Sequence, residues 1–276
     1  MTAVPYPGPR PAGPLAGRVA LVTGVSRRVG IGLAVARRLA ALGAGLFVTS
    51  WAAHDREQPW GADPGGVAAV LAELGSGDAS SPAVGRVEHL EADLLDPEAP
   101  DRVMAAAVEA FGHVDILVCN HARSSLGGLG QLTTAELDAS FAVNTRAVLL
   151  LVQAFAAQHD GRPGGRVVLF TSGQHLGPMP GELAYAASKG ALVEVTASLA
   201  DTLADRGVTV NTINPGPTDT GYVDQATRER VATMFPAGRW GAPDDAARLV
   251  AWLCTDDAAW VTGQVVNSEG GFRRFR

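Results

Sequence analysis

The sequence predicts an α/β fold, with a single doubly wound parallel sheet of about seven strands and helices on both faces. From Arg18 onward, short runs rich in Val, Leu and Ile alternate with Ala-rich amphipathic stretches. The strand-like runs lack the apolar–polar alternation of a sheet with one wet face, so both faces are expected to be covered. A chain of 276 residues, 47% of them hydrophobic, is long enough to bury such a core as one domain.

Strands and helices are expected in strict alternation along the chain, with right-handed crossovers between parallel strands. The expected strands are 18–23, 46–50, 87–93, 115–120, 166–172, 208–214 and 263–267. The expected helices are 32–43, 97–112, 134–159, 185–206 and 244–255. Two connections, 51–66 and 218–241, are too long for plain connections and are predicted to be mobile loops. Loops of this length are often functional.

Composition excludes several classes of protein. Residues 1–16 are rich in Pro and Gly and are expected to be a disordered arm before one domain over 17–276. The net charge of -6 and the lack of a basic stripe argue against a nucleic-acid partner. Cys119 and Cys254 lie in apolar runs and form neither a disulfide framework nor a metal cluster, which fits a cytoplasmic location. No signal peptide and no apolar run of membrane-spanning length is seen, so no membrane partner is expected.

A glycine-rich turn, T-G-V-S-R-R-V-G-I-G over 23–32, follows the first strand and opens the first helix. Gly24 permits a tight turn, while Gly30 and Gly32 let the backbone approach a pyrophosphate at a helix N-terminus. The strand–turn–helix setting indicates a Rossmann-type dinucleotide site that includes Ser26 and Ile31. The alternative is that these glycines serve only the turn geometry.

This turn resembles the T-G-x-x-x-G-x-G motif of the classical short-chain dehydrogenase/reductase family, especially its 3-oxoacyl-[acyl-carrier-protein] reductase-like branch. Here five residues rather than three separate Gly24 from Gly30. The resemblance extends from about Ala16 to the end of the chain. It implies a bound nicotinamide dinucleotide and a ketone or alcohol substrate.

The residues after the second expected strand favour NADPH over NADH. NAD-preferring folds commonly place an acid there to bind the ribose hydroxyls, whereas this chain has Ser50 and Trp51. Arg27 and Arg28 in the glycine turn lie close enough to meet a 2′-phosphate, which suits the forked donors of arginine. The alternatives are that both are solvated loop charges, and that Asp55 and Glu57 support NADH.

The resemblance also assigns cofactor contacts after other strands. Asp93 matches the aspartate that meets the adenine, although it could instead cap the following helix. His121 departs from the family's alanine and lines the ribose or serves a structural role. The remaining contacts implied are Leu94, Asn120, Tyr185, Lys189, Pro215, Gly216, Thr218 and Thr220.

Tyr185 and Lys189 lie four residues apart in a predicted helix, so their side chains share one face. A free tyrosine has a pKa near 10, which is high for proton exchange at neutral pH. A unit charge about 5 Å away, at an effective dielectric of about 20, stabilises the phenolate by roughly 3 kcal/mol, or about two pKa units. Lys189 is therefore expected to lower the pKa of Tyr185 toward the range where acid–base catalysis is efficient.

Ser172 ends the fifth expected strand, thirteen residues before Tyr185, at the sheet edge where such folds bind ligands. Its hydroxyl could stabilise charge on a substrate oxygen. By resemblance, Asn144 bends the long helix and holds a water that relays protons to Lys189. Its alternative role is a polar residue bonded to its own backbone. Asn144, Ser172, Tyr185 and Lys189 are thus the predicted catalytic residues.

The hypothesis is an NADP(H)-dependent ketoreductase of a small keto substrate, either free or carrier-bound, with tetramer assembly implied by the resemblance. Predicted substrate contacts are Gln174, His175, Met179 and Tyr222. A carrier protein would favour a basic patch, for which Arg228, Arg230 and Arg239 are the candidates, although Asp224 and Glu229 dilute it. The alternatives are a non-catalytic nucleotide-binding protein of the same fold, an enoyl reductase, against which the tight Y-x-x-x-K spacing argues, and an NAD-dependent alcohol dehydrogenase of secondary metabolism.

Overall fold

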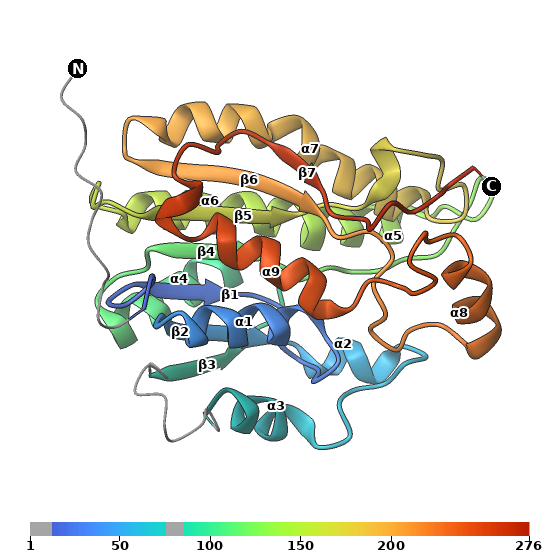
Figure 1. Ribbon diagram of the computed structural model, residues 1–276, viewed down its shortest axis with the longest axis horizontal. Helices are drawn as coiled ribbons and strands as arrows, with labels where there is room; N and C mark the ends of the chain where they lie inside the picture. The colour runs from blue at the N-terminus through green and yellow to red at the C-terminus, as the bar shows by residue number, and fades with distance from the viewer. Residues whose placement is uncertain (1–12, 76–85, 276) are drawn as a thin grey trace.

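The computed structural model describes residues 13–75 and 86–275. Within these residues a seven-stranded sheet forms the centre, in the order β3-β2-β1-β4-β5-β6-β7, and every strand pair is parallel (Figure 1). The strands are β1 (Val19–Val22), β2 (Gly45–Ser50), β3 (Val87–Glu91), β4 (Ile116–Cys119), β5 (Gly165–Phe170), β6 (Val208–Asn214) and β7 (Val265–Asn267). The predicted parallel sheet of about seven strands is confirmed.

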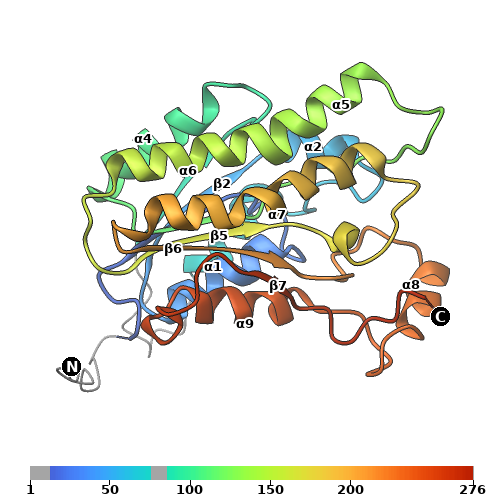
Figure 2. The ribbon, with the colours of Figure 1, turned by 90° about the horizontal axis from the view of Figure 1, so that it is seen from above.

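Helices cover both faces of this sheet. Figure 2 shows α1 and α9 on one face and α4, α6 and α7 on the other. Each face has its own cluster of buried aliphatic side chains, which explains why the strands are apolar along their whole length. The helical segments are α1 (Ile31–Ala41), α2 (Ala52–Glu57), α3 (Gly66–Gly75), α4 (Ala99–Phe111), α5 (Thr134–Phe141), η1 (Ala142–Arg146), α6 (Ala147–Gln158), η2 (Gly173–His175), α7 (Leu183–Ala204), α8 (Gln225–Ala232), α9 (Pro243–Leu253) and η3 (Asp256–Ala258).

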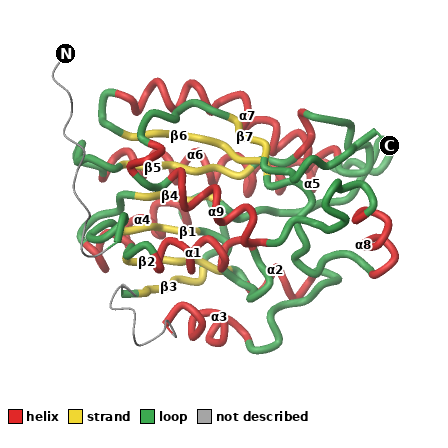
Figure 3. The backbone as a smooth tube through the Cα atoms, viewed as in Figure 1, coloured by secondary structure: helices red, strands yellow, loops and turns green. Residues whose placement is uncertain are grey.

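The strand order reverses at β1, which lies between β2 and β4. Leu21 of β1 is in register with Phe47 of β2 and with Leu117 of β4. The connections that leave β1 and β4 therefore diverge to opposite sides of the sheet and open a crevice at its carboxyl edge, where α/β folds bind ligands. Figure 3 shows long loops gathered at this same edge, around α2 and α8.

The predicted helix over 134–159 is continuous but irregular. A π-helical segment, η1, interrupts it between α5 and α6 and contains Asn144. The whole run, Thr134–Gln158, is by length and composition apolar enough to cross a membrane, and it is the only such helix in the described part of the chain. Of its most apolar stretch, 44% is buried. Val148, Leu151 and Phe155 face the core, so its apolar character has an explanation within the fold.

Both predicted loops contain a helix, which corrects the expectation that these connections are loops throughout. The 51–66 connection holds α2 and a turn at Asp63, whose carboxylate accepts from the backbone N–H groups of Arg28 and Gly65 at 2.8 and 3.0 Å. The 218–241 connection holds α8, which Asp224 caps by accepting from the Thr227 amide at 2.7 Å. Side-chain hydrogen bonds to backbone donors supply the order that the lengths of these segments do not reveal.

The Pro- and Gly-rich arm is partly incorporated into the fold. Residues 1–12 of the predicted arm lie outside the described residues. Leu15, however, is fully buried, and its amide donates to the Leu42 carbonyl at 2.9 Å. The expectation of disorder over 1–16 is wrong at Leu15, because this side chain joins the hydrophobic cluster beneath α1. Cys119 and Cys254 are buried free thiols, as the sequence predicts.

Candidate active site

The glycine-rich turn is held against the end of β4. Gly24 has a positive φ of 75°, which only glycine adopts readily. The Asn120 side chain donates to the carbonyl oxygens of Thr23 and Gly24 at 3.0 and 3.1 Å. A Cβ on Gly32 would overlap the Gly24 oxygen and lie 2.7 Å from Asn120 Nδ2. Gly24 and Gly32 are therefore required by the turn itself, as well as by its proposed ligand.

The first turn of α1 opens directly onto the crevice. Its N-cap residue is Gly30, which offers no side chain to satisfy the free N–H groups of that turn. Such donors, together with the helix dipole, favour an anion such as a phosphate. Gly30 and Ile31 line the cavity described next, so these donors face the space where a ligand fits.

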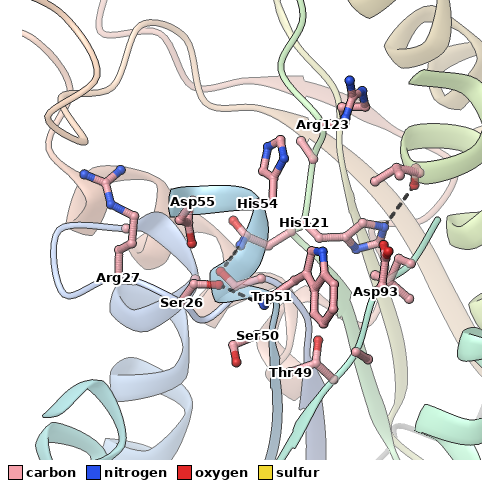
Figure 4. A pocket seen from close by; sticks show the side chains of 18 of the residues that line it. Ser26, Arg27, Thr49, Ser50, Trp51, His54, Asp55, Asp93, His121 and Arg123 are labelled. Atoms are coloured by element: carbon pink, nitrogen blue, oxygen red, sulfur yellow. Dashed lines mark hydrogen bonds between the residues drawn. The ribbon is translucent and has the colours of Figure 1, made fainter. Parts of the chain in front are cut away.

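A cavity of about 480 Å³ lies at the carboxyl ends of β1, β2, β3 and β4. Figure 4 shows Ser26, Arg27 and Asp55 near one end and Asp93 and His121 near the other. Expected cofactor residues that line it are Gly24, Ser26, Arg27, Gly30, Ile31, Ser50, Trp51, Asp93, Leu94, Asn120, His121 and Thr220. Lining residues that the sequence did not single out are Thr49, Ala53, His54, Ala92, Leu95, Ala122, Arg123 and Val143.

The two arginines of the glycine turn have different surroundings. Arg27 lines the cavity. Arg28 instead pairs with Asp63, at 2.9 Å from Nη2 to Oδ1, and this guanidinium holds the pKa of Asp63 at about 2, against the opposing effect of burial. Arg28 does not line the cavity, and its Nε and Nη2 atoms bind an internal carboxylate, so its contact with a 2′-phosphate stays a prediction.

Asp55 brings an acid to the arginine end of the cavity. Burial raises the pKa of its carboxyl group, while hydrogen bonds from Trp60 and Ser26 and the nearby charge of Arg27 oppose this rise. Both Asp55 and Glu57 line the cavity with Arg27. The alternative that Asp55 and Glu57 support binding of NADH therefore keeps a structural basis.

The wall of the cavity combines an indole with polar groups. The Trp51 amide donates to Ser26 Oγ at 3.2 Å, which joins the end of β2 to the glycine turn. Ser50 Oγ lies 2.8 Å from His89 Nε2, so this hydroxyl is held by its neighbouring strand. Asp93 Oδ1 accepts from the Leu95 amide at 2.9 Å, which fixes the carboxylate at the cavity wall without making it a helix cap.

His121 has a structural role. Its Nδ1 lies 2.7 Å from the Thr23 hydroxyl and its Nε2 lies 3.1 Å from the Val143 carbonyl oxygen, so both ring nitrogens have partners. Burial, aided by the charge of Lys189, lowers the pKa of His121 to about 3. The ring is therefore neutral at physiological pH and ties the end of β1 to η1 beside the cavity.

Acidification is expected to destabilise the protein through His121. The folded pKa lies below the ordinary value of 6.5, so between these values the unfolded chain binds a proton that the folded chain does not. The free energy of unfolding should fall by about 1.4 kcal/mol per pH unit in this window. Urea unfolding of the wild type and His121→Ala at about pH 7 and about pH 5 measures this difference. An equal decrease in both proteins contradicts the assignment.

The predicted catalytic side chains meet where β5 ends beside α7. The Thr171 hydroxyl donates to the Lys189 carbonyl at 2.9 Å and the Lys189 ammonium donates to the Phe170 carbonyl at 2.8 Å, which locks the strand end to the helix. Ser172 lies close enough to Tyr185 to lower the pKa of its phenol. Ser172, Tyr185 and Lys189 are thus brought together at the carboxyl edge, although none of them lines the 480 Å³ cavity.

The expected effect of Lys189 on Tyr185 is not found in this structure. Burial raises the pKa of Tyr185 to about 12, although the Ser172 hydrogen bond lowers it, and the charge of Glu182 raises it further. Burial also lowers the pKa of Lys189 to about 8. Lys189 is not among the groups that shift the pKa of Tyr185, because its ammonium donates to the Phe170 carbonyl, and desolvation disfavours the charged form of each group.

Asn144 is fully buried within η1. Its side chain accepts from the Arg123 amide at 2.7 Å and donates to the Arg123 carbonyl at 2.9 Å and to Ser188 Oγ at 3.0 Å. The Ser188 hydroxyl in turn donates to the Tyr185 carbonyl at 2.9 Å. Asn144 therefore connects the irregular helix with the catalytic turn of α7, and its bonds lie outside its own helix, contrary to the alternative reading.

The P-G-P-T-D-T segment after β6 is shaped by its own polar groups. Gly216 has a φ of 65° and donates from its amide to Asn214 Oδ1 at 3.0 Å. The buried Thr218 donates to the Gly216 carbonyl at 3.2 Å. Thr220 reaches the cavity, whereas Pro215, Gly216 and Thr218 do not line it.

The C-terminal segment is tied to the same region. The Asn214 side chain donates to Glu269 Oε1 at 2.7 Å, and Glu269 forms an ion pair with Arg274. The Arg274 guanidinium lies directly over Gly173, where no side chain would fit. The tail thus covers the loop that begins at Ser172.

The predicted substrate residues have unequal access. Gln174 is turned to the Thr171 hydroxyl at 2.9 Å, while His175 is exposed and Met179 is partly buried. The Tyr222 side chain is 44% exposed. Burial raises the pKa of its phenol to about 12, with smaller contributions from Tyr185, Glu182 and Asp219.

Comparison with known proteins agrees with this geometry. Residues 24–273 match a protein family described as Enoyl-(Acyl carrier protein) reductase. An uncharacterized oxidoreductase, YjdA of Bacillus subtilis (strain 168), is 39% identical over 93% of this chain and 97% of its own. The chain belongs to the short-chain dehydrogenase/reductase family. It is therefore an oxidoreductase by family.

Other members of the short-chain dehydrogenase/reductase family are similar over nearly their full lengths. Versicolorin reductase 1 of Aspergillus parasiticus is 33% identical over 93% of this chain and 97% of its own. A blue fluorescent protein from a metagenomic library, solved with NADPH, has a TM-score of 0.81 at 33% identity, with 94% and 99% covered. The angucycline C-6 ketoreductase LanV, solved with NADP, has a TM-score of 0.79 at 31% identity, with 94% and 96% covered.

Proposed function

We propose that this protein is an NADPH-dependent ketoreductase that converts a ketone to a secondary alcohol. The observation that carries the proposal is that Ser172 and Tyr185 lie close enough to interact, with Lys189 one helical turn further on and fixed to the same strand end. Two hydroxyl groups at the carboxyl edge suit a carbonyl oxygen that gains charge and then a proton. The names of the versicolorin reductase and LanV relatives support ketone reduction.

The residues present fit a dinucleotide. The uncapped N-terminus of α1 and the glycine turn would hold the pyrophosphate, Arg27 would meet a 2′-phosphate, and Trp51 and Asp93 would border the adenine. Structures of relatives with bound NADPH and NADP support this choice. When bound, the dihydronicotinamide supplies the hydride that adds to the carbonyl carbon.

The side chains of the protein then handle the carbonyl oxygen and the proton. The Ser172 and Tyr185 hydroxyls donate to the ketone oxygen and stabilise its growing negative charge. Tyr185 transfers its phenolic proton to that oxygen, which completes the alcohol. Lys189, whose pKa of about 8 lets it release a proton near neutral pH, restores the phenol. Asn144 supports this turn through Ser188.

The test is a reaction with purified protein, NADPH and a panel of ketones. Loss of NADPH absorbance with formation of the matching secondary alcohol is the expected result. The panel includes α,β-unsaturated thioesters, because the matched family is described as an enoyl reductase. Reduction of the C=C bond alone would replace ketone reduction by enoyl reduction. Binding of NADPH without turnover of any carbonyl would favour a nucleotide-binding protein without catalysis.

Arg27→Ala is expected to raise the KM for NADPH about 10-fold and to leave the KM for NADH within about two-fold, because a lost arginine–phosphate interaction is worth about 1.5–3 kcal/mol. Asp55→Asn should lower the KM for NADPH, since it removes a nearby negative charge. Initial rates with both cofactors measure this. Arg248→Ala, whose side chain is 67% exposed on α9, is the matched loss of a surface charge. A similar change for both cofactors in Arg27→Ala contradicts the assignment.

A small free substrate is favoured over a carrier-bound one. Arg228 pairs with Asp219 at 3.2 Å and Arg239 pairs with Asp245 at 2.7 Å, so two of the three arginines of the expected basic patch are neutralised by carboxylates. Tetramer assembly and a cytoplasmic location, both expectations from the sequence, belong to the same proposal.

A further inference from the structure

The glycine-rich turn has five residues between Gly24 and Gly30, where the family motif has three. Arg27 lines the cavity, whereas the next two residues, Arg28 and Val29, are exposed to solvent. A longer turn has more conformations to lose when a ligand binds to it. A contact that fixes the turn before binding therefore increases the affinity for that ligand.

Asp63 holds the projecting part of this turn. Its carboxylate accepts from the backbone amide of Arg28 at 2.8 Å and from Nε of the same residue at 2.9 Å. Nη2 of Arg28 lies 2.9 Å from the same carboxylate. Charge-assisted hydrogen bonds of this kind are stronger than bonds between neutral groups. One side chain thus fixes both the main chain and the side chain of Arg28.

Asp63 is itself held in place by its surroundings. Its side chain is only 5% exposed, and the Gly65 amide donates to Oδ1 at 3.0 Å. A Cβ on Gly65 would lie 2.5 Å from the Ala69 Cβ and 3.5 Å from Arg28 Nη2, so this segment packs closely against both α3 and the guanidinium. Removal of one partner from such a buried pair is costly, because the other charge loses its compensation.

The segment from β2 to Asp63 is bound to the glycine turn at both of its ends. At its start, the Trp51 amide donates to Ser26 Oγ at 3.2 Å (Figure 4). At its end is the contact of Asp63 with Arg28. Between these contacts, α2 contributes to the cavity wall the residues Ala53, His54, Asp55 and Glu57. The glycine turn and this wall are therefore joined, and Asp63 makes the joining contact farther along the chain.

We propose that Asp63 is a positioning residue for the cofactor. Through Arg28 it holds the enlarged glycine turn, so that the N–H donors at the start of α1 and the side chain of Arg27 face the cavity. Asp63 is not one of the residues that line the cavity, so it acts without touching the ligand. The inference rests on the proposed binding of a dinucleotide, and it adds a residue that the glycine motif does not include.

A role in positioning and a role as a negative charge predict opposite results for Asp63→Asn. Loss of a negative charge near a phosphate site strengthens the binding of an anionic cofactor, as expected above for Asp55→Asn. Loss of a positioning contact weakens binding, because the turn must then be ordered by the cofactor itself. Since NADPH and NADH share the pyrophosphate that the turn binds, both cofactors should be affected.

The experiment is a titration of wild type and Asp63→Asn with each reduced cofactor, followed by nicotinamide fluorescence. The exchange keeps the size of the side chain and removes its charge. The Kd should rise about 10-fold for NADPH and NADH alike, since hydrogen bonds to a charged group are lost. The kcat at saturating NADPH should stay within about two-fold of the wild type. Unchanged or tighter binding overturns the inference, as does a loss confined to NADPH.

Asp160→Asn is the matched control. Asp160 accepts from the backbone amide of Arg162 at 3.1 Å and from its Nε at 2.8 Å, the same pair of bonds, but it lies between α6 and β5 at the opposite edge of the sheet. This variant should leave both Kd values unchanged. All titrations are made well below the melting temperature of each variant. An equal loss of affinity in the two variants means general destabilisation and overturns the inference.

Arg28→Ala tests whether the effect passes through this arginine. Its backbone bond to Asp63 remains, so the Kd should rise by only about three-fold, equally for both cofactors. The double variant with Asp63→Asn should lose less than the product of the two single losses, because the residues are in contact. An effect of Arg28→Ala on NADPH alone overturns the inference, since it means that Arg28 contacts the 2′-phosphate.

The same titrations separate this inference from the proposed function. If the wild type binds neither dinucleotide, the cofactor assignment and the inference fail together. If it binds both but reduces no ketone, the proposed ketone reduction fails, while the Kd values of Asp63→Asn and Asp160→Asn still decide the role of Asp63.

Discussion

Tyr185→Phe is expected to lower kcat for ketone reduction about 10²–10⁴-fold, the range that a positioned general acid contributes. The exchange removes one oxygen atom and leaves the ring that packs at the start of α7. It also removes the hydroxyl group that interacts with Ser172. NADPH consumption under saturating ketone measures the loss, and direct titration with NADPH should show binding within about two-fold of the wild type.

Ser172→Ala provides the companion measurement. It removes a donor to the ketone oxygen and retains the phenolic proton, so a decrease in kcat of about 10²–10³-fold is expected. The double variant should lose much less than the product of the two single losses, because the residues act as a unit. Folded Tyr185→Phe protein with wild-type turnover is incompatible with proton transfer from this phenol.

Gly32→Ala is expected to abolish detectable NADPH binding and to lower the melting temperature by several degrees. The new methyl group would lie 2.7 Å from Asn120 Nδ2 and would overlap the Gly24 oxygen, both of which are fixed by hydrogen bonds. Overpacking of this kind costs about 1–3 kcal/mol. Displacement of the turn would also misalign the donors at the N-terminus of α1.

Gly75→Ala is the matched control for this prediction. Gly75 ends α3, its φ is not in the left-handed region, and a Cβ there would meet nothing within 4 Å. The same added methyl group should leave NADPH affinity unchanged and the melting temperature unchanged or slightly raised. Calorimetry on both variants decides between a local and a general effect, and normal NADPH affinity in Gly32→Ala contradicts the role given to the turn.

The sheet and most of its helices could be predicted because burial on two faces leaves a continuous apolar run in the sequence of each buried strand. The segment α3 was missed, although Val70 and Leu74 bury its apolar side. Its sequence is apolar nearly throughout and lies inside an irregular stretch, so periodicity gave little contrast. The π-helical register at Asn144 depends on partners from other elements, Arg123 and Ser188.

The candidate site residues were predicted from motif and spacing, whereas their surroundings could not be predicted from the sequence. Arg27 and Arg28 are equivalent as a sequence pair, and only the fold shows that Asp63 occupies one of them. The pKa values of Tyr185 and Lys189 depend on desolvation, which requires the packed structure. Arg123, which lines the cavity, was not predicted as a site residue. Its ion pair with Glu136 at 2.7 Å joins segments that are distant in the sequence.

The ion pair of Glu269 and Arg274 has a practical consequence for anyone who prepares this protein. Arg274 rests on the loop that begins at Ser172. A purification tag fused after Arg276 is therefore expected to disturb the end of the strand that carries Ser172. A tag placed before Met1 avoids this disturbance. Kinetic comparisons among the variants above are therefore best made on material tagged at its beginning.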